Sequence, residues 1–146
     1  MKSNLVTLAA LALLAAAPLA ARPQAQAPFY SVDTERRAEG TIKDVVFEPR
    51  YGDRAPFLIM ILEEKGSGTL YRVEISPAWF FDRDLHKGEK VKIVGSYYAK
   101  DGVNYLIARQ LQAGGETFML RDSRGFPTWR GGAAKAKGWR RRGQGM

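Results

Sequence analysis

Cysteine is absent from this 146-residue chain, and histidine occurs only once, at position 86. Without cysteine there is no disulfide framework, no thiolate metal site, no covalent haem attachment and no lipid-modified cysteine. The fold therefore has to be stabilised by its core. The hydrophobic content of 45% is sufficient for one packed domain.

A hydrophobic run long enough to cross a bilayer is also lacking. Residues 5–17 form an apolar or small-residue run of 13, preceded by one cation, Lys2. A membrane-spanning helix needs about 20 such residues, whereas a signal-peptide core needs about 7 to 15. Small residues follow up to Ala27 and offer several cleavage points. The sequence therefore predicts a signal peptide and cleavage region over residues 1–27, and a periplasmic or secreted protein without a lipid anchor.

Motifs for catalysis are missing as well. His86 stands beside Lys87 near the end of an expected helix, which favours a solvated or capping role over general-base catalysis. The acidic pairs Glu63/Glu64 and Asp82/Asp84 lie at turn-like and helix-end positions, without the spacing of an EF-hand. No phosphate loop and no nucleophile elbow occurs. We therefore expect no enzyme activity, no metal site and no cofactor.

The net charge of +8 is concentrated in the C-terminal part of the chain. Residues 22–120 carry 14 Lys/Arg and 14 Asp/Glu, whereas residues 121–146 carry eight Lys/Arg and one Asp. Residues 131–146 consist of small, basic and polar residues with a single aromatic, so we expect a disordered basic tail.

Such a tail binds polyanions through counterion release, with no sequence readout. Its candidate contact residues are Lys135, Lys137, Trp139, Arg140, Arg141 and Arg142. For an exported chain the expected partners are an anionic membrane surface or extracellular nucleic acid. A purely solubilising C-terminus is the alternative.

Five β-strands and one helix are expected after a linker at residues 28–38. Residues 69–75 alternate, with Tyr71, Val73 and Ile75 opposite Arg72 and Glu74. Ser76-Pro77 is typical of a helix start, and Asp101-Gly102 of a hairpin turn. Gly95, isolated within an expected strand, indicates a bulge or a sharp bend. The expected strands cover residues 39–48, 57–63, 69–75, 89–98 and 103–111, and the helix covers 78–85. This order predicts a five-stranded OB-fold barrel over residues 39–112, with the helix closing one end.

The entry to the fourth expected strand carries a recognisable pattern. Residues 85–96 read Leu-His-Lys-Gly-Glu-Lys-Val-Lys-Ile-Val-Gly-Ser, and residues 106–109 on the next strand read Leu-Ile-Ala-Arg. Over residues 40–112 the chain thereby resembles small exported bacterial OB-fold proteins. The resemblance implies an OB-fold, and members of that group are assigned to ligand binding or stress tolerance.

Residues 113–130 follow the expected barrel and are predicted to fold back on it as an extension. Phe118, Leu120, Phe126 and Trp129 are its apolar residues, and they serve either as core or as one wall of a binding groove.

The function predicted from these observations is an exported, non-catalytic binding module for an oligomeric or anionic ligand: an oligosaccharide, a peptide or nucleic acid. OB-folds bind on strands two and three and on the loops after strands one and four. The candidate ligand-binding residues are Arg50, Tyr51, Arg54, Tyr71, Arg72, Tyr97, Tyr98 and Lys100. The alternative is an envelope scaffold protein that adheres to an anionic surface through its tail. Its protein partner is unknown.

Overall fold

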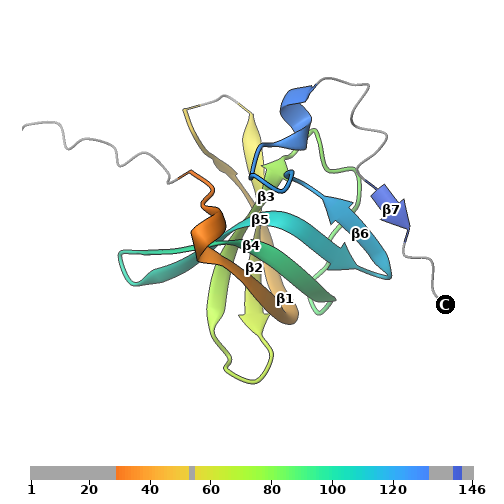
Figure 1. The fold of residues 1–146 in the computed structure, drawn as a ribbon. Helices are drawn as coiled ribbons and strands as arrows, with labels where there is room; N and C mark the ends of the chain where they lie inside the picture. The colour runs from red at the N-terminus through yellow and green to blue at the C-terminus, as the bar shows by residue number, and fades with distance from the viewer. Residues whose placement is uncertain (1–28, 53–54, 132–139, 143–146) are drawn as a thin grey trace, which may run out of the picture.

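The computed structural model describes residues 29–52, 55–131 and 140–142. These residues form seven β-strands and two short 3₁₀ helices, and they contain no α-helix (Figure 1). No helix in this described part is long and apolar enough to cross a membrane. The elements in chain order are η1 (Val32–Thr34), β1 (Glu35–Pro49), β2 (Pro56–Glu64), β3 (Leu70–Pro77), β4 (Lys90–Lys100), β5 (Val103–Ala113), β6 (Glu116–Met119), η2 (Thr128–Gly131) and β7 (Arg140–Arg142).

Strands β1 to β5 close into a barrel. Antiparallel pairing joins β1 to β2, β2 to β3, β1 to β4 and β4 to β5. Parallel pairing of β3 with β5 completes the circle. This order confirms the predicted five-stranded OB-fold barrel. Strand β1 begins at Glu35 rather than Glu39, so part of the expected linker belongs to the barrel.

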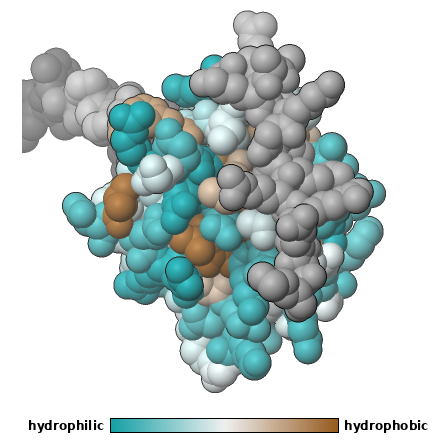
Figure 2. Space-filling view, turned by 45° about the vertical axis from the view of Figure 1, so that its right-hand side comes forward, coloured by the Kyte–Doolittle hydropathy of each residue, from teal (hydrophilic) through white to brown (hydrophobic). Residues whose placement is uncertain are grey.

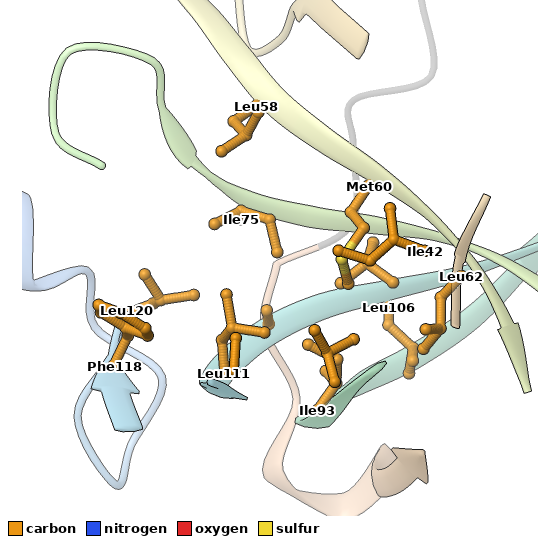
Figure 3. Packing of buried hydrophobic residues seen from close by; sticks show 14 of the residues in the cluster. Ile42, Leu58, Met60, Leu62, Ile75, Ile93, Leu106, Leu111, Phe118 and Leu120 are labelled. Carbon is orange, nitrogen blue, oxygen red and sulfur yellow. The ribbon is translucent and has the colours of Figure 1, made fainter. Parts of the chain in front are cut away.

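The core follows the alternation of the strands. Val73 and Ile75 on β3 are fully buried inside the barrel, as are Met60 and Leu62 on β2. Figure 3 shows Met60 and Leu62 from β2, Ile75 from β3 and Leu106 and Leu111 from β5 pointing toward one another. The outside of the molecule is more polar: the face turned forward in Figure 2 is mostly hydrophilic, with hydrophobic residues in small separate patches.

The predicted helix over residues 78–85 is wrong. Ala78, Trp79 and Phe80 form a turn closed by a 3.0 Å hydrogen bond from the Phe80 N–H to the Pro77 carbonyl. The Ser76 hydroxyl donates to the Pro77 carbonyl instead of capping a helix. Aromatic and Asp residues are weak helix formers, and acidic residues near a helix C-terminus oppose its dipole.

Two consecutive phenylalanines do the packing that was expected of this helix. Phe80 and Phe81 are both buried in the core cluster, and Leu85 packs partly against it. The Phe80 ring lies 5.6 Å from that of Trp129, and the Phe81 ring lies 5.2 Å from that of Phe118. An irregular segment can therefore direct two adjacent rings toward different parts of the core.

Gly95 lies at an irregularity in the pairing of β4 with β5. The β4–β5 register shifts between Val94 and Gly95, as the isolated glycine in this strand predicted. A Cβ atom at Gly95 would stand only 2.6 Å from the carbonyl oxygen of Ile107 on β5. The backbones approach so closely here that a side chain does not fit.

The extension, predicted over residues 113–130, covers residues 114–131, because Ala113 still belongs to β5 and η2 ends at Gly131. It contains β6, which pairs with β5. Phe118 and Leu120 are completely buried, and Figure 3 shows both beside Leu111. Trp129 packs partly against the core, whereas Phe126 stays 63% exposed. Within the tail that was expected to be disordered, β7 pairs with β6 over three residues. An edge strand such as β6 offers unpaired backbone groups that favour this pairing.

A salt bridge ties the start of β1 to β5. The Glu35 carboxylate accepts hydrogen bonds from Nε and Nη2 of Arg109, at 2.9 and 2.7 Å. The Tyr30 hydroxyl donates to the same carboxylate at 2.5 Å. Chiefly through the Arg109 hydrogen bonds, the pKa of Glu35 lies below its usual value, while burial raises the pKa of Tyr30 to about 12. The lead-in to β1 is thereby held against the barrel.

We predict that Gly95→Ala destabilises the protein by about 1–3 kcal/mol, because the added methyl group collides with the β5 backbone. Urea unfolding measures the effect, and Lys92→Ala, at an exposed position of the same strand, is the control. An unchanged midpoint for Gly95→Ala would mean that the two strands are not in close contact at this point.

Glu35→Gln is predicted to remove part of the pH dependence of stability. A carboxylate with a lowered pKa stabilises the fold above the pKa of the unfolded chain and loses this contribution as the pH falls through the folded value. Wild type should therefore be more stable than Glu35→Gln at pH 7, and the difference should shrink below about pH 4. Thermal unfolding across pH measures this, and a constant difference would contradict it.

Candidate functional site

The outer face of the barrel carries an unusual row of buried residues. Ile59 on β2 pairs with Glu74 on β3, which pairs with Ile107 on β5. Their chain neighbours Met60, Val73 and Leu106 point into the core, so this row points outward. All three residues of the row are nevertheless only 2% exposed. Other parts of the chain must therefore cover this face.

Two segments provide the cover. One is the L12 loop, residues 50–55, which connects β1 to β2. The other is the extension, residues 114–131. Arg50 and Tyr51 reach the face from the L12 loop, and Arg121 and Trp129 reach it from the extension. We call Arg50, Tyr51, Glu74 and Arg121 the Glu74 cluster.

The Glu74 carboxylate is the centre of this cluster. Its Oε2 accepts hydrogen bonds from Nη2 of Arg50 at 3.0 Å and from the Tyr51 hydroxyl at 2.7 Å. Its Oε1 accepts one from Nη2 of Arg121 at 2.8 Å. The side chains of Glu74 and Arg121 are 2% and 4% exposed. Arg121 also donates to the carbonyl of Ala108, and its guanidinium lies 4.8 Å from the Trp129 ring centroid. The buried charges thus have partners on all sides.

The electrostatics of the Glu74 cluster leave a positive surplus, because one carboxylate faces two guanidinium groups. Burial lowers the pKa of Arg121. Burial also acts to lower the pKa of Arg50, but the Tyr98 hydroxyl and the Glu74 charge outweigh it, so that pKa is raised. Burial, followed by the Glu74 charge, raises the pKa of Tyr51 far above its usual value. At neutral pH the tyrosine is therefore an uncharged donor beside a net positive group.

Three tyrosine rings lie around the guanidinium group of Arg50. Tyr98 on β4 and Tyr105 on β5 stack in parallel, with ring centroids 4.7 Å apart and an angle of 3° between the rings. Nη2 of Arg50 donates to the Tyr98 hydroxyl at 3.0 Å, and its guanidinium carbon lies 6.0 Å from the Tyr105 centroid. Tyr51 remains 44% exposed, with its ring edge-on to Phe57. A cation and three tyrosines therefore meet on one side of the barrel.

Three of the predicted ligand-binding residues meet at this place: Arg50, Tyr51 and Tyr98. Tyr71 does not, because it is buried in the core, where its ring packs edge-on against Tyr97. The alternation that places Val73 and Ile75 inside also turns Tyr71 inward.

The remaining predicted residues have other surroundings. Arg72 is paired with Glu48, and Lys100 is exposed beside the β4–β5 turn. Tyr97 bonds to Asn104, and Arg36 covers its ring. Arg54 lies outside the described residues, as do Lys135, Lys137 and Trp139 of the tail and the expected signal peptide. Arg140, Arg141 and Arg142 form β7.

Sequence reasoning missed Glu74, Tyr105 and Arg121 as site residues, whereas Trp129 was expected either in the core or in one wall of a groove. The alternation placed Glu74 on the strand face opposite Tyr71, Val73 and Ile75, which is correct, but it gave no sign that this face is covered. The partners that bury it lie 24 and 47 positions away in the chain. The only signal in the sequence was an acidic residue in a strand next to Tyr71 and Val73, and nothing local distinguishes such a residue from a solvated one.

Groups suited to catalysis do not gather in the described residues. His86 is exposed, and its backbone N–H donates to Glu89. No group of three His, Asp or Glu side chains in this part of the chain is placed to hold a metal ion.

Comparison with protein families matches residues 34–118 to the MamS/MamX magnetosome protein family. These residues make up more than half of the 146-residue chain. The chain belongs to the MamS/MamX magnetosome protein family. The predicted five-stranded barrel is present, but the family that matches is the MamS/MamX family and not a group of OB-fold proteins. No curated protein and no solved structure matches the chain.

The MamS/MamX match covers all five barrel strands, together with Arg50, Tyr51, Glu74, Tyr98 and Tyr105. It ends at Phe118, so Arg121 and Trp129 lie beyond it. In this MamS/MamX protein, the matched segment therefore contains the outer face with Glu74 and the L12 loop that covers it, and the part of the extension that holds Arg121 and Trp129 covers the same face from beyond the match.

Glu74→Gln is predicted to destabilise the protein by about 3–5 kcal/mol, because it leaves the buried guanidinium of Arg121 without its counter-ion. The control is Glu48→Gln, which breaks the partly exposed pair with Arg72 and should cost less than about 1 kcal/mol. Urea unfolding measures both variants. Equal effects would show that Glu74 is not held as described.

Proposed function

We propose that this chain is an exported, non-catalytic binding module that holds an oligomeric or anionic ligand at the mouth formed by the L12 loop and strands β4 and β5. The observation that carries the proposal is the convergence of Arg50, Tyr51, Tyr98 and Tyr105 at this place. OB-folds bind oligonucleotides and oligosaccharides beside the corresponding loops. The match to a magnetosome protein family supports the proposal that this binding takes place at the magnetosome.

The chemistry of the mouth supports a ligand with flat or ring-shaped units and negative charge. Tyrosine rings offer stacking surfaces to bases and sugars, and Arg50 supplies the positive charge that Glu74 does not fully balance. Both features suit a repeating polymer better than a small neutral molecule.

The rings are held in place before any ligand arrives. Tyr51 has a left-handed backbone, with φ of 56°, which is strained for a residue other than glycine. Its hydroxyl donates toward both carboxylate oxygens of Glu74, at 2.8 and 2.7 Å. This contact keeps the loop in its strained conformation. Fixed side chains lose little entropy on binding, so this arrangement favours affinity.

Two parts of the proposal rest on the sequence: that the protein is exported, and that it is not a catalyst. The chain has one histidine and no cysteine, and its N-terminal 27 residues have the pattern of a signal peptide. The exposed position of His86 adds support, since it lies outside the mouth.

The test is equilibrium binding of the full mature chain to a labelled single-stranded dT oligonucleotide and to a heparin oligosaccharide. Tyr105→Leu removes one stacking ring while keeping an apolar side chain. Because a stacked base contributes about 1–3 kcal/mol, we expect affinity for the bound probe to fall about tenfold or more. Tyr97→Phe is the control, because it removes a tyrosine hydroxyl on the core side of the neighbouring strand β4.

The contribution of the tail is separated by replacing Arg140, Arg141 and Arg142 with serine. This variant should weaken binding mainly at low salt and should leave the tenfold effect of Tyr105→Leu in place. Unchanged affinity in Tyr105→Leu, or binding that disappears entirely with the three arginines, would contradict the proposal.

A further inference from the structure

A second surface feature lies on the extension and contains none of the residues of the mouth. After the buried Leu120 the chain makes a tight turn over residues 122–127, which we call the 122–127 turn. The Asp122 N–H donates to the Phe126 carbonyl at 3.0 Å, and the Gly125 N–H donates to the Asp122 carbonyl at 3.0 Å. A bridge between Arg121 and Pro127 closes its base. The turn is therefore a defined, hydrogen-bonded structure.

The Asp122 side chain fixes the turn further. Its Oδ1 accepts hydrogen bonds from the backbone N–H groups of Arg124 at 2.9 Å and Phe126 at 3.0 Å. These bonds, that of Phe126 foremost, hold the pKa of Asp122 below its usual value. Gly125 has φ of +90°, a conformation that other residues rarely adopt. The carboxylate of Asp122, the one acidic residue of the turn, therefore binds backbone N–H groups of the turn itself.

What the turn presents to solvent is an aromatic ring with a cation on it. Phe126 is 63% exposed, and the Arg124 guanidinium carbon lies 5.6 Å from its ring centroid. A second exposed ring belongs to a segment that contacts the turn: Tyr30 packs directly against Gly125, and its chain neighbour Phe29 is 84% exposed. Two phenylalanines, on chain segments far apart in sequence, therefore flank one contact.

The charge that follows the turn in the sequence has one sign. From Arg124 to the last residue the chain carries seven Lys/Arg and no Asp or Glu. Arg124 and Arg130 are exposed in the structure, on either side of Phe126 in the sequence. Exposed apolar rings next to clustered cations are what an anionic lipid surface binds, because the rings enter the interface and the cations meet the headgroups.

We propose that the 122–127 turn is a membrane wedge that, together with Phe29 and the exposed cations Arg124 and Arg130, docks the barrel on an anionic lipid bilayer. Phenylalanine has no hydrogen-bonding group to read a base or a sugar, and one face of Phe126 already carries Arg124. A lipid surface accepts both features at once. This docking uses no residue of the L12 mouth, so it is independent of the function proposed above.

Cosedimentation of the full mature chain with vesicles tests the wedge. Binding is compared between vesicles of phosphatidylglycerol mixed with phosphatidylcholine and vesicles of phosphatidylcholine alone. Phe126→Ser should weaken binding to the anionic vesicles about tenfold, because a ring that enters the interface is lost. Phe47→Ser is the matched control: Phe47 is 62% exposed, but it lies on β1 beside Glu48, and this variant should bind as wild type does.

The absence of cysteine allows a second, direct readout. Phe126→Cys labelled with an environment-sensitive dye should shift its emission to the blue when anionic vesicles are added. Phe47→Cys labelled in the same way should not shift. This measurement separates insertion of the turn from attraction of the tail alone.

Three outcomes would overturn the wedge. The first is wild-type affinity of Phe126→Ser, including the case in which only replacement of the three terminal arginines reduces binding. The second is an unshifted dye at position 126 in vesicle-bound protein. The third is a loss of binding by Phe126→Ser that appears with a dT oligonucleotide and not with vesicles, which would identify the turn as a nucleic-acid contact.

Discussion

The ion cluster around Glu74 joins parts of the chain that the barrel itself does not bring together. One carboxylate on β3 binds Arg50 and Tyr51 from the L12 loop and Arg121 from the extension. Removing a charge from water is costly, and the cost is recovered only where each lone pair finds a donor. The L12 loop and the extension are therefore both required for Glu74 to stay buried. The position of the aromatic mouth and of the 122–127 turn depends on this requirement.

In the sequence, the two proposed surfaces come before and after Glu74: the L12 loop precedes it, and the 122–127 turn follows it. The L12 loop leads from the barrel to Tyr51 and the tyrosine stack, all inside the segment that matches the MamS/MamX family. Arg121 is followed directly by the turn that exposes Phe126, beyond that segment. In the two proposals taken together, the barrel would bring a ligand beside the L12 loop close to a lipid surface that the extension contacts.

How far the sequence predicts this protein depends on whether the relevant contacts are local. The alternation of residues 69–75, the Asp101-Gly102 turn and the isolated Gly95 are local signals, and with them the barrel was predicted correctly. The helix over residues 78–85 was wrong because tertiary packing of Phe80 and Phe81 outweighed a plausible helix start. Within the site, Arg50, Tyr51 and Tyr98 were predicted as loop and strand-end residues, whereas Glu74 and Arg121 were missed because each is buried by residues distant in sequence.

The most direct test of the account is a double-mutant cycle on Glu74 and Arg121, with Glu74→Leu, Arg121→Met and the double variant compared by urea unfolding. If the two charges are buried against each other, each single change leaves an unpaired charge, and the double variant should lose far less stability than the sum of the two. Additive losses would contradict the account, since they would mean that Glu74 does not hold the extension to the barrel.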